Sequence, residues 1–157
     1  MRRMDITLTD EPTRLVAVVR RSVPLAEIRG FFDTAYGDVI AALAAAGRSP
    51  GGPALGWLHH DGSPEALDIA AGFPVTDAEI GALADGVEVV AIPGGPSLVA
   101  EYVGPYDDLP DAWQAIEDHR RAAGLELRGD TVEEYLTEPT PDGDPTLNRT
   151  RLAMMVR

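Results

Sequence analysis

A short segment near the C-terminus places acidic and aromatic side chains at every second residue. The sequence from Glu133 to Pro139 reads Glu-Glu-Tyr-Leu-Thr-Glu-Pro. On an extended strand, side chains two residues apart point to the same face, so Glu133, Tyr135 and Thr137 are expected to share one face. A carboxylate beside a phenol suits two kinds of chemistry. It attracts an organic cation where water is partly excluded, and it can accept a proton from water as a general base.

Glu134 offers a second carboxylate on the other face of the same predicted strand, between the apolar residues Val132 and Leu136. Two interpretations follow. Either Glu134 reaches the edge of the sheet and Glu133 is the acid of the site, or the register differs by one residue and Glu134 takes that place.

A second aromatic pair, Trp57 and His59, also shares one face of a predicted strand. Trp57 and Tyr135 each lie about ten residues beyond a glycine that ends a predicted helix. We therefore expect them to be equivalent and to line two sides of one cleft. Taken singly, each aromatic is more typical of a core, but a face with Glu, Tyr, Trp and His is too polar for a closed core.

Two further tyrosines lie close in sequence to the second predicted helix. Tyr102 lies next to the last residue of a predicted strand, and Tyr106 completes the step Gly104-Pro105-Tyr106 into the helix. Aromatic rings of this kind contribute about 0.5–2 kcal/mol each to binding a cation. Tyr106 suits two roles equally well, ligand contact and packing at the helix entrance.

The elements that position these residues occur twice, over about residues 14–75 and 97–156. Each copy reads strand, proline-marked helix start, amphipathic helix, glycine-marked stop and two strands. A short helix capped by Thr76 and running through Ile80 and Leu83 is expected between the copies. The expected elements are strands 14–20, 54–60, 67–75, 87–92, 98–103, 131–137 and 151–156, a helix from a Ser22 cap to Gly47, and a helix from an Asp107 or Asp108 cap to Gly124.

Composition excludes several classes of protein. The 157 residues carry a formal charge of −13, whereas direct nucleic-acid binding requires a basic surface. About a dozen residues precede the first predicted strand, too few for a DNA-binding helix-turn-helix. No apolar run approaches the roughly 20 residues of a membrane span, so no membrane partner is expected. The absence of cysteine and of a signal peptide predicts a cytoplasmic protein.

Metal and cofactor chemistry is not indicated either. His59 and His60 are neighbours that point to opposite faces of a strand, and His119 is the remaining histidine. This arrangement does not suit a zinc site, and no phosphate-binding loop follows Pro93-Gly94-Gly95-Pro96. The sequence implies neither a metal nor a cofactor.

The order of the elements, Gly104-Pro105-Tyr106 and the segment Glu133–Pro139 resemble the GyrI-like small-molecule-binding domain. The stretches Gly56–Asp61 and Ala71–Val75 also fit this superfamily. It includes effector-binding domains of multidrug-responsive transcription regulators and stand-alone proteins. The resemblance implies an α+β fold in which residues 1–157 form one ligand-binding domain. Two β-α-β-β units, an SHS2-like pair, would form a pseudo-twofold antiparallel sheet with two main helices and a ligand cleft.

The resemblance also implies a function. Such clefts take lipophilic, planar and often cationic compounds, with the glutamate that matches Glu133 at the pocket floor. Tyr135, Trp57, His59, Tyr102 and Tyr106 are then the expected ligand contacts. A second possibility is a hydrolase of cyclopropane-bearing DNA-alkylating compounds, with Glu133 and Tyr135 as the catalytic pair. A third is an acidic protein-interaction or inhibitor module with an unknown protein partner.

Overall fold

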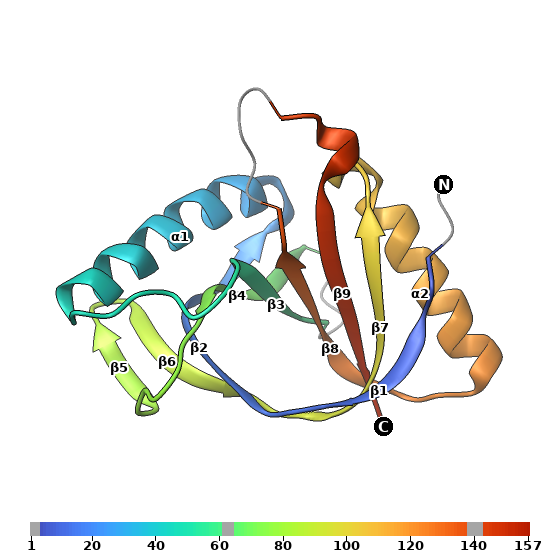
Figure 1. Ribbon diagram of the computed structural model, residues 1–157, viewed down its shortest axis with the longest axis horizontal. Coiled ribbons are helices and arrows are strands. Elements are labelled where there is room, and N and C mark those ends of the chain that lie inside the picture. The colour runs from blue at the N-terminus through green and yellow to red at the C-terminus, as the bar shows by residue number, and fades with distance from the viewer. Residues whose placement is uncertain (1–3, 61–64, 138–142) are drawn as a thin grey trace. The chain divides into compact units, whose positions relative to one another are not determined.

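The computed structural model describes residues 4–60, 65–137 and 143–157, which form two compact units (Figure 1). The first unit is Pro12–Gly94, and the second joins Met1–Glu11 to Gly95–Arg157. The chain therefore passes between the units twice, once on each side of the first unit. The predicted turn at 61–64 and the last two residues of Glu133–Pro139 lie outside the described residues.

The first unit is an antiparallel sheet with one long helix on one face (Figure 1). A turn of 3-10 helix, Leu25–Glu27, precedes this helix. The strands pair in the order β3-β4-β2-β6-β5. The elements are β2 (Arg14–Pro24), α1 (Ile28–Ala45), β3 (Leu55–His59), β4 (Ala66–Pro74), β5 (Gly81–Ala84) and β6 (Val87–Ile92).

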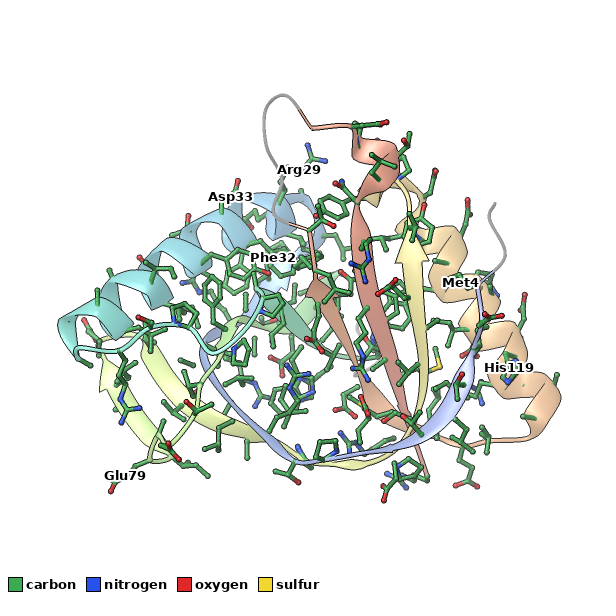
Figure 2. The ribbon with its side chains drawn as sticks, viewed as in Figure 1. Met4, Arg29, Phe32, Asp33, Glu79 and His119 are labelled. Carbon is green, nitrogen blue, oxygen red and sulfur yellow. The ribbon has the colours of Figure 1, made fainter. Side chains whose placement is uncertain are left out.

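The apolar side of α1 builds the core of this unit. Its buried residues recur at helical spacing, and they meet the alternate residues of β2 and β4 that face the helix. Phe32 lies on the sheet-facing side of α1, whereas the next residue, Asp33, is exposed (Figure 2). The central residues of this core are Val19, Val23, Phe31, Ala35, Val39, Leu43, Ile69 and Ala71.

The second unit repeats the order strand, helix, strand, strand. Its strands pair antiparallel in the order β8-β9-β7-β1, and α2 lies against the face that carries Leu98, Ala100 and Leu152. Gly124 ends α2 in the left-handed conformation at φ 68°, as the sequence predicts. The elements are β1 (Thr7–Glu11), β7 (Gly95–Val103), α2 (Leu109–Ala123), β8 (Leu127–Tyr135) and β9 (Arg149–Val156).

The predicted α+β class and the duplicated β-α-β-β order are confirmed, but three local predictions are wrong. The short helix through Ile80 and Leu83 is absent, since this segment leads into β5 and Ile80 is 67% exposed. Positive φ angles at Asp77 and Gly81 are incompatible with a right-handed helix there. Ser22 lies within β2 and does not cap a helix, and β1 precedes the strand expected to come first.

In the described residues, no helix is long and apolar enough to cross a bilayer.

Gly72 permits a close approach of β4 to β2, because a Cβ there would overlap the carbonyl oxygen of Ala17. We expect Gly72→Ala to lower the free energy of unfolding by about 3 kcal/mol or more, since a backbone oxygen cannot move aside cheaply. The matched change Gly37→Ala lies in α1, where a Cβ meets nothing within 4 Å. It should raise stability by about 1 kcal/mol. Urea unfolding of both variants checks the pair, and equal effects would contradict it.

Candidate functional site

The Glu133 carboxylate accepts a hydrogen bond on each of its two oxygens. Trp113 Nε1 donates to Oε1 at 2.6 Å, and the Tyr135 hydroxyl donates to Oε2 at 2.6 Å. All three side chains are half-buried. Donors on both oxygens, coming from two different elements, fix the Glu133 carboxyl group in one orientation.

Strand alternation and helix spacing bring these groups together. Glu133 and Tyr135 lie on the face of β8 that α2 covers, cross-strand from Leu152 and Thr150 of β9. Trp113 follows Leu109 by one helical turn of α2, so its ring lies over the same sheet face. Polar side chains on a covered face need partners, and here the partners come from the aromatic residues themselves.

Tyr106 packs against this group from the entrance of α2. Its ring meets that of Tyr135 edge-on, with the centroids 5.7 Å apart, and its hydroxyl donates to the carbonyl oxygen of Thr137 at 3.5 Å. Burial raises the pKa of Tyr106 above its usual value of 10.0. The residue therefore packs at the helix entrance and lies beside the Glu133 group. Its contact with a ligand stays a prediction.

Tyr102 and Thr150 extend the same face. Tyr102, Thr150 and Tyr135 lie in a row across β7, β9 and β8. Tyr102 is buried, and its hydroxyl donates to the carbonyl oxygen of Pro105 at 3.2 Å. Thr150 is fully buried, and its hydroxyl has no hydrogen-bond partner in the described part of the chain. Such a buried hydroxyl without a partner is uncommon in a folded protein.

A cavity of about 620 Å³ opens where β7 leads into α2. Tyr102 lines it together with Asp108 and Asp111 from the start of the helix. Its volume falls within the range of roughly 300–1,000 Å³ that is typical of small-molecule sites. Two carboxylates beside an aromatic ring suit a cation better than an anion.

Glu134 takes no part in this group. It lies on the opposite face of β8, where it is 7% exposed and accepts a hydrogen bond from Arg151 Nη1 at 3.3 Å. Arg151 is its cross-strand neighbour in β9 and also pairs with Glu11. Glu134 is therefore an ion-paired structural residue, neither reaching to the edge of the sheet nor replacing Glu133 beside Tyr135.

Trp57 and His59 form an aromatic pair in the first unit, with ring centroids 4.3 Å apart. The Arg20 guanidinium lies 5.7 Å from the Trp57 ring and forms an ion pair with Asp68 at 2.9 Å. The pair shares its sheet face with Arg20 and Asp68, while Arg21, next along β2, lies over the ring of Phe31 in α1.

The predicted equivalence of Trp57 and Tyr135 is wrong. Trp57 lies on the face of its sheet opposite α1, because its neighbours Gly56 and Leu58 face that helix. Tyr135 lies on the face that α2 covers. Trp57 follows Gly47 by ten residues and Tyr135 follows Gly124 by eleven, and a difference of one residue moves a side chain to the other face.

Sequence reasoning missed two residues of the group, Trp113 and Thr150. From the sequence alone, the spacing of Trp113 from Leu109 and Ile116 indicates only a place on the apolar face of the second helix. The chemistry of its side chain could have revealed its role, because an indole N–H on a covered face needs an acceptor. Glu133 is the nearby acid on that face. No sequence signal marks Thr150, because its burial depends on the pairing of β9 with both neighbours.

The sequence matches the GyrI-like small molecule binding domain over residues 4–157. The chain therefore belongs to this family of small-molecule-binding domains. Among proteins of curated function, none matches the sequence significantly.

Three solved structures illustrate the shared fold. The C-terminal domain of EcmrR is 18% identical, with a TM-score of 0.75 and 98% of each chain covered. SAV2435, solved bound to tetraphenylphosphonium, is 14% identical, with a TM-score of 0.71 over 98% of this chain and 94% of the other. A hydrolase encoded by lin2189 of Listeria innocua is 13% identical, with a TM-score of 0.62 over 97% and 91%. At these identities the likeness shows the fold.

The ion pair of Asp68 with Arg20 gives a prediction about pH. The hydrogen bond from Arg20 holds the pKa of Asp68 below its usual value of 3.8, although burial opposes this shift. A carboxyl whose pKa is lowered by folding adds stability above its unfolded pKa, and that stability is lost as the pH falls through the folded value. Both side chains are partly exposed, so we expect Asp68→Asn to cost less than about 1 kcal/mol at pH 7 and nothing near pH 2. Urea unfolding at both values measures this, and an equal cost at both would contradict it.

The hydrogen bond between Trp113 and Glu133 can be tested by a double-mutant cycle. Trp113→Phe keeps an aromatic ring but removes the donor, and should lower the free energy of unfolding by about 1 kcal/mol for a half-buried site. The same change in a Glu133→Gln background should cost measurably less, because the charged acceptor has already been removed. Strictly additive effects in urea unfolding would show that the two groups are not coupled.

Proposed function

We propose that this protein binds lipophilic organic cations at the Glu133 site, for sequestration or sensing of such compounds. The observation that carries the proposal is the carboxylate held by two aromatic donors on a half-buried sheet face. Membership of a small-molecule-binding family supports it, as does the structural likeness to SAV2435, which was solved with a lipophilic cation.

The physical basis is the environment of a single charge. Where water is partly excluded, a carboxylate attracts a large organic cation more strongly than it would in bulk water. The rings of Tyr106, Tyr135 and Trp113 add cation–π contacts of about 0.5–2 kcal/mol each. The existing hydrogen bonds do not block binding, because a cation such as a tetraarylphosphonium has no N–H or O–H and requires no free lone pair.

The proposed site includes Glu133, Tyr135, Tyr106 and Tyr102. Aromatic contacts of this kind require no exact polar match, so one site can accept compounds of different shape. The overall charge of −13 also favours the approach of cations. A contribution of Trp57 and His59 to ligand binding stays a prediction, which Trp57→Leu would test in the same binding assay.

A second candidate function is hydrolysis of a strained cyclopropane ring. The hydrogen bond between Tyr135 and Glu133 favours it, together with the likeness to a protein described as a hydrolase. Glu133 would accept a proton from water while the water oxygen forms a bond to a ring carbon and one ring C–C bond breaks. The electron pair of that bond would pass to the other ring carbon or to the group conjugated with it, which then takes up the proton from Glu133. Tyr135 would orient the water or the substrate, and the product would be heavier by one water.

Binding is tested by titrating the protein with tetraphenylphosphonium in a calorimeter. We expect Glu133→Gln to weaken binding about tenfold or more, since it removes the charge but keeps the shape of the side chain. Glu126→Gln is the matched control, because it makes the same change in net charge at an exposed residue of the same unit. Equal affinity of wild type and Glu133→Gln would overturn the role of Glu133.

Hydrolysis is tested by mass spectrometry after incubation with a cyclopropane-bearing alkylating compound. Conversion to a product heavier by one water, lost in Glu133→Gln and in Tyr135→Phe, would establish the second function. Recovery of the intact compound from a protein that still binds tetraphenylphosphonium would rule out hydrolysis and leave binding as the function.

A further inference from the structure

One edge of β2 is left without a strand over half of its length. β2 pairs with β4 from Val16 to Pro24, but it pairs with β6 only from Arg14 to Val18. Strand β6 begins at Val87, directly after the turn from β5, and is therefore too short to reach the second half of β2. Within the described residues, no strand therefore pairs with the outer edge of β2 beyond Val18.

The main-chain groups at this edge point outward. The carbonyl oxygen of Leu15 accepts from Val75, and the amide of Leu25 donates to Glu65, so the odd residues of β2 direct their main-chain groups toward β4. In an antiparallel sheet the intervening residues direct theirs to the other side. The N–H and C=O groups of Arg20 and Ser22 therefore face the unoccupied edge, and both residues are exposed.

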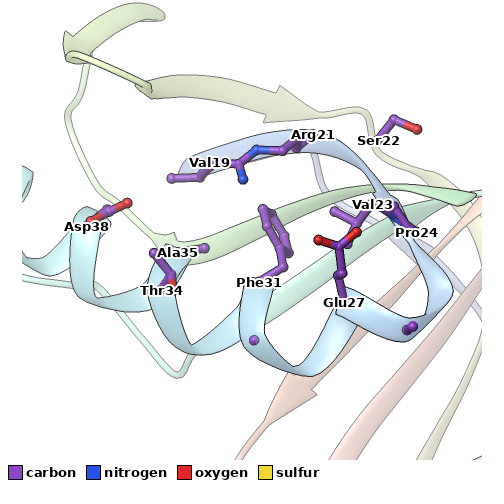
Figure 3. Close-up of a pocket in the computed structure, with 12 residues that line it drawn as sticks. Val19, Arg21, Ser22, Val23, Pro24, Glu27, Phe31, Thr34, Ala35 and Asp38 are labelled. Carbon is purple, nitrogen blue, oxygen red and sulfur yellow. The ribbon is translucent and has the colours of Figure 1, made fainter.

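A groove of about 460 Å³ lies between this edge and α1 (Figure 3). Phe31 points from the helix toward β2, and the Arg21 guanidinium lies 5.4 Å from the centre of its ring. Val23 and Ala35 add apolar surface. Figure 3 shows the helix side of the groove with Glu27 near one end and Asp38 near the other.

We propose that this edge and groove bind an extended segment of a basic partner protein, which adds to β2 as a further strand. Main-chain hydrogen bonds to Arg20 and Ser22 would hold the segment, as in other complexes formed by strand addition. Its alternate side chains would enter the groove, where an apolar residue meets Phe31 and basic residues meet Glu27 and Asp38. The proposal does not depend on the small-molecule site and shares no residue with it.

Charge decides between a basic partner and a second copy of this chain. Two copies joined at this edge would bring the same carboxylates of α1 together, in a protein of net charge −13. Pro24 also limits the edge to a few residues, which is a common device against self-pairing of sheets. A basic segment avoids the repulsion between the carboxylates, and its pairing with Arg20 and Ser22 ends before Pro24.

The test uses a display library of seven-residue peptides in which positions 2 and 6 are lysine, position 4 is any apolar residue and the other positions vary, so that these three side chains share one strand face. The library is selected against the full-length protein. Enriched peptides should slow the amide hydrogen exchange of Arg20 and Ser22 by about tenfold or more at saturation. The same peptides N-methylated on alternate amides should not bind, because they cannot pair with the edge. Failure to select any binder overturns the proposal, as does undiminished binding of the N-methylated peptides.

Two variants place the interaction on the molecule. Ser22→Pro removes an N–H that β4 does not use, and should weaken an enriched peptide about tenfold. Asp38→Lys should weaken it several-fold, whereas Asp33→Lys, an exposed acid of the same helix that does not line the groove, should not. Equal losses for the two lysine variants, or a dimer in sedimentation that Ser22→Pro abolishes, would overturn the basic partner. Tetraphenylphosphonium titration of each variant separates these outcomes from failure of the small-molecule proposal.

Discussion

The carboxylate of Glu133 must be satisfied on a sheet face that a helix covers, and much of the second unit follows from this requirement. A half-buried charge without hydrogen-bond partners would lower the free energy of unfolding substantially. Its two donors come from different elements, Trp113 from α2 and Tyr135 from the same strand. The position of α2 therefore brings the Trp113 indole to the Glu133 carboxylate, and the alternation of β8 places Tyr135 on the same face. The chemistry of the site and the packing of the unit are thus one arrangement.

Two adjacent glutamates show how the pleat divides roles. Glu133 and Glu134 are joined by one peptide bond, yet they meet different partners on opposite faces. Glu134 is paired with the permanently charged Arg151, which fixes it in a structural role. The two donors that contact Glu133 in the described part of the chain, the Trp113 indole and the Tyr135 hydroxyl, are uncharged. An uncompensated carboxylate of this kind is the type that the proposed cation site requires.

The features that depend on local sequence pattern could be predicted from the sequence alone. Strand alternation correctly grouped Glu133 with Tyr135, and glycine at the end of α2 marked its boundary. The errors arose where pairing overrides local preference. Thr76 and Glu79 form a plausible capping box, but the segment after them is drawn into the β5–β6 hairpin. β1 carries little pattern of its own and exists because β7 offers it an edge. The donor role of Trp113 and the buried hydroxyl of Thr150 depend on neighbours distant in sequence.

The two units share an order of elements but not a chemistry, and the reason lies in the strand that follows each helix. In the first unit, the residues of β3 that face α1 are Gly56 and Leu58, which complete an apolar core with Phe32. In the second unit, the corresponding face of β8 presents Glu133 and Tyr135 to α2. A duplicated fold therefore does not imply a duplicated site. In the first unit this face of the strand completes an apolar core with the helix, whereas in the second unit it holds a carboxylate among aromatic rings.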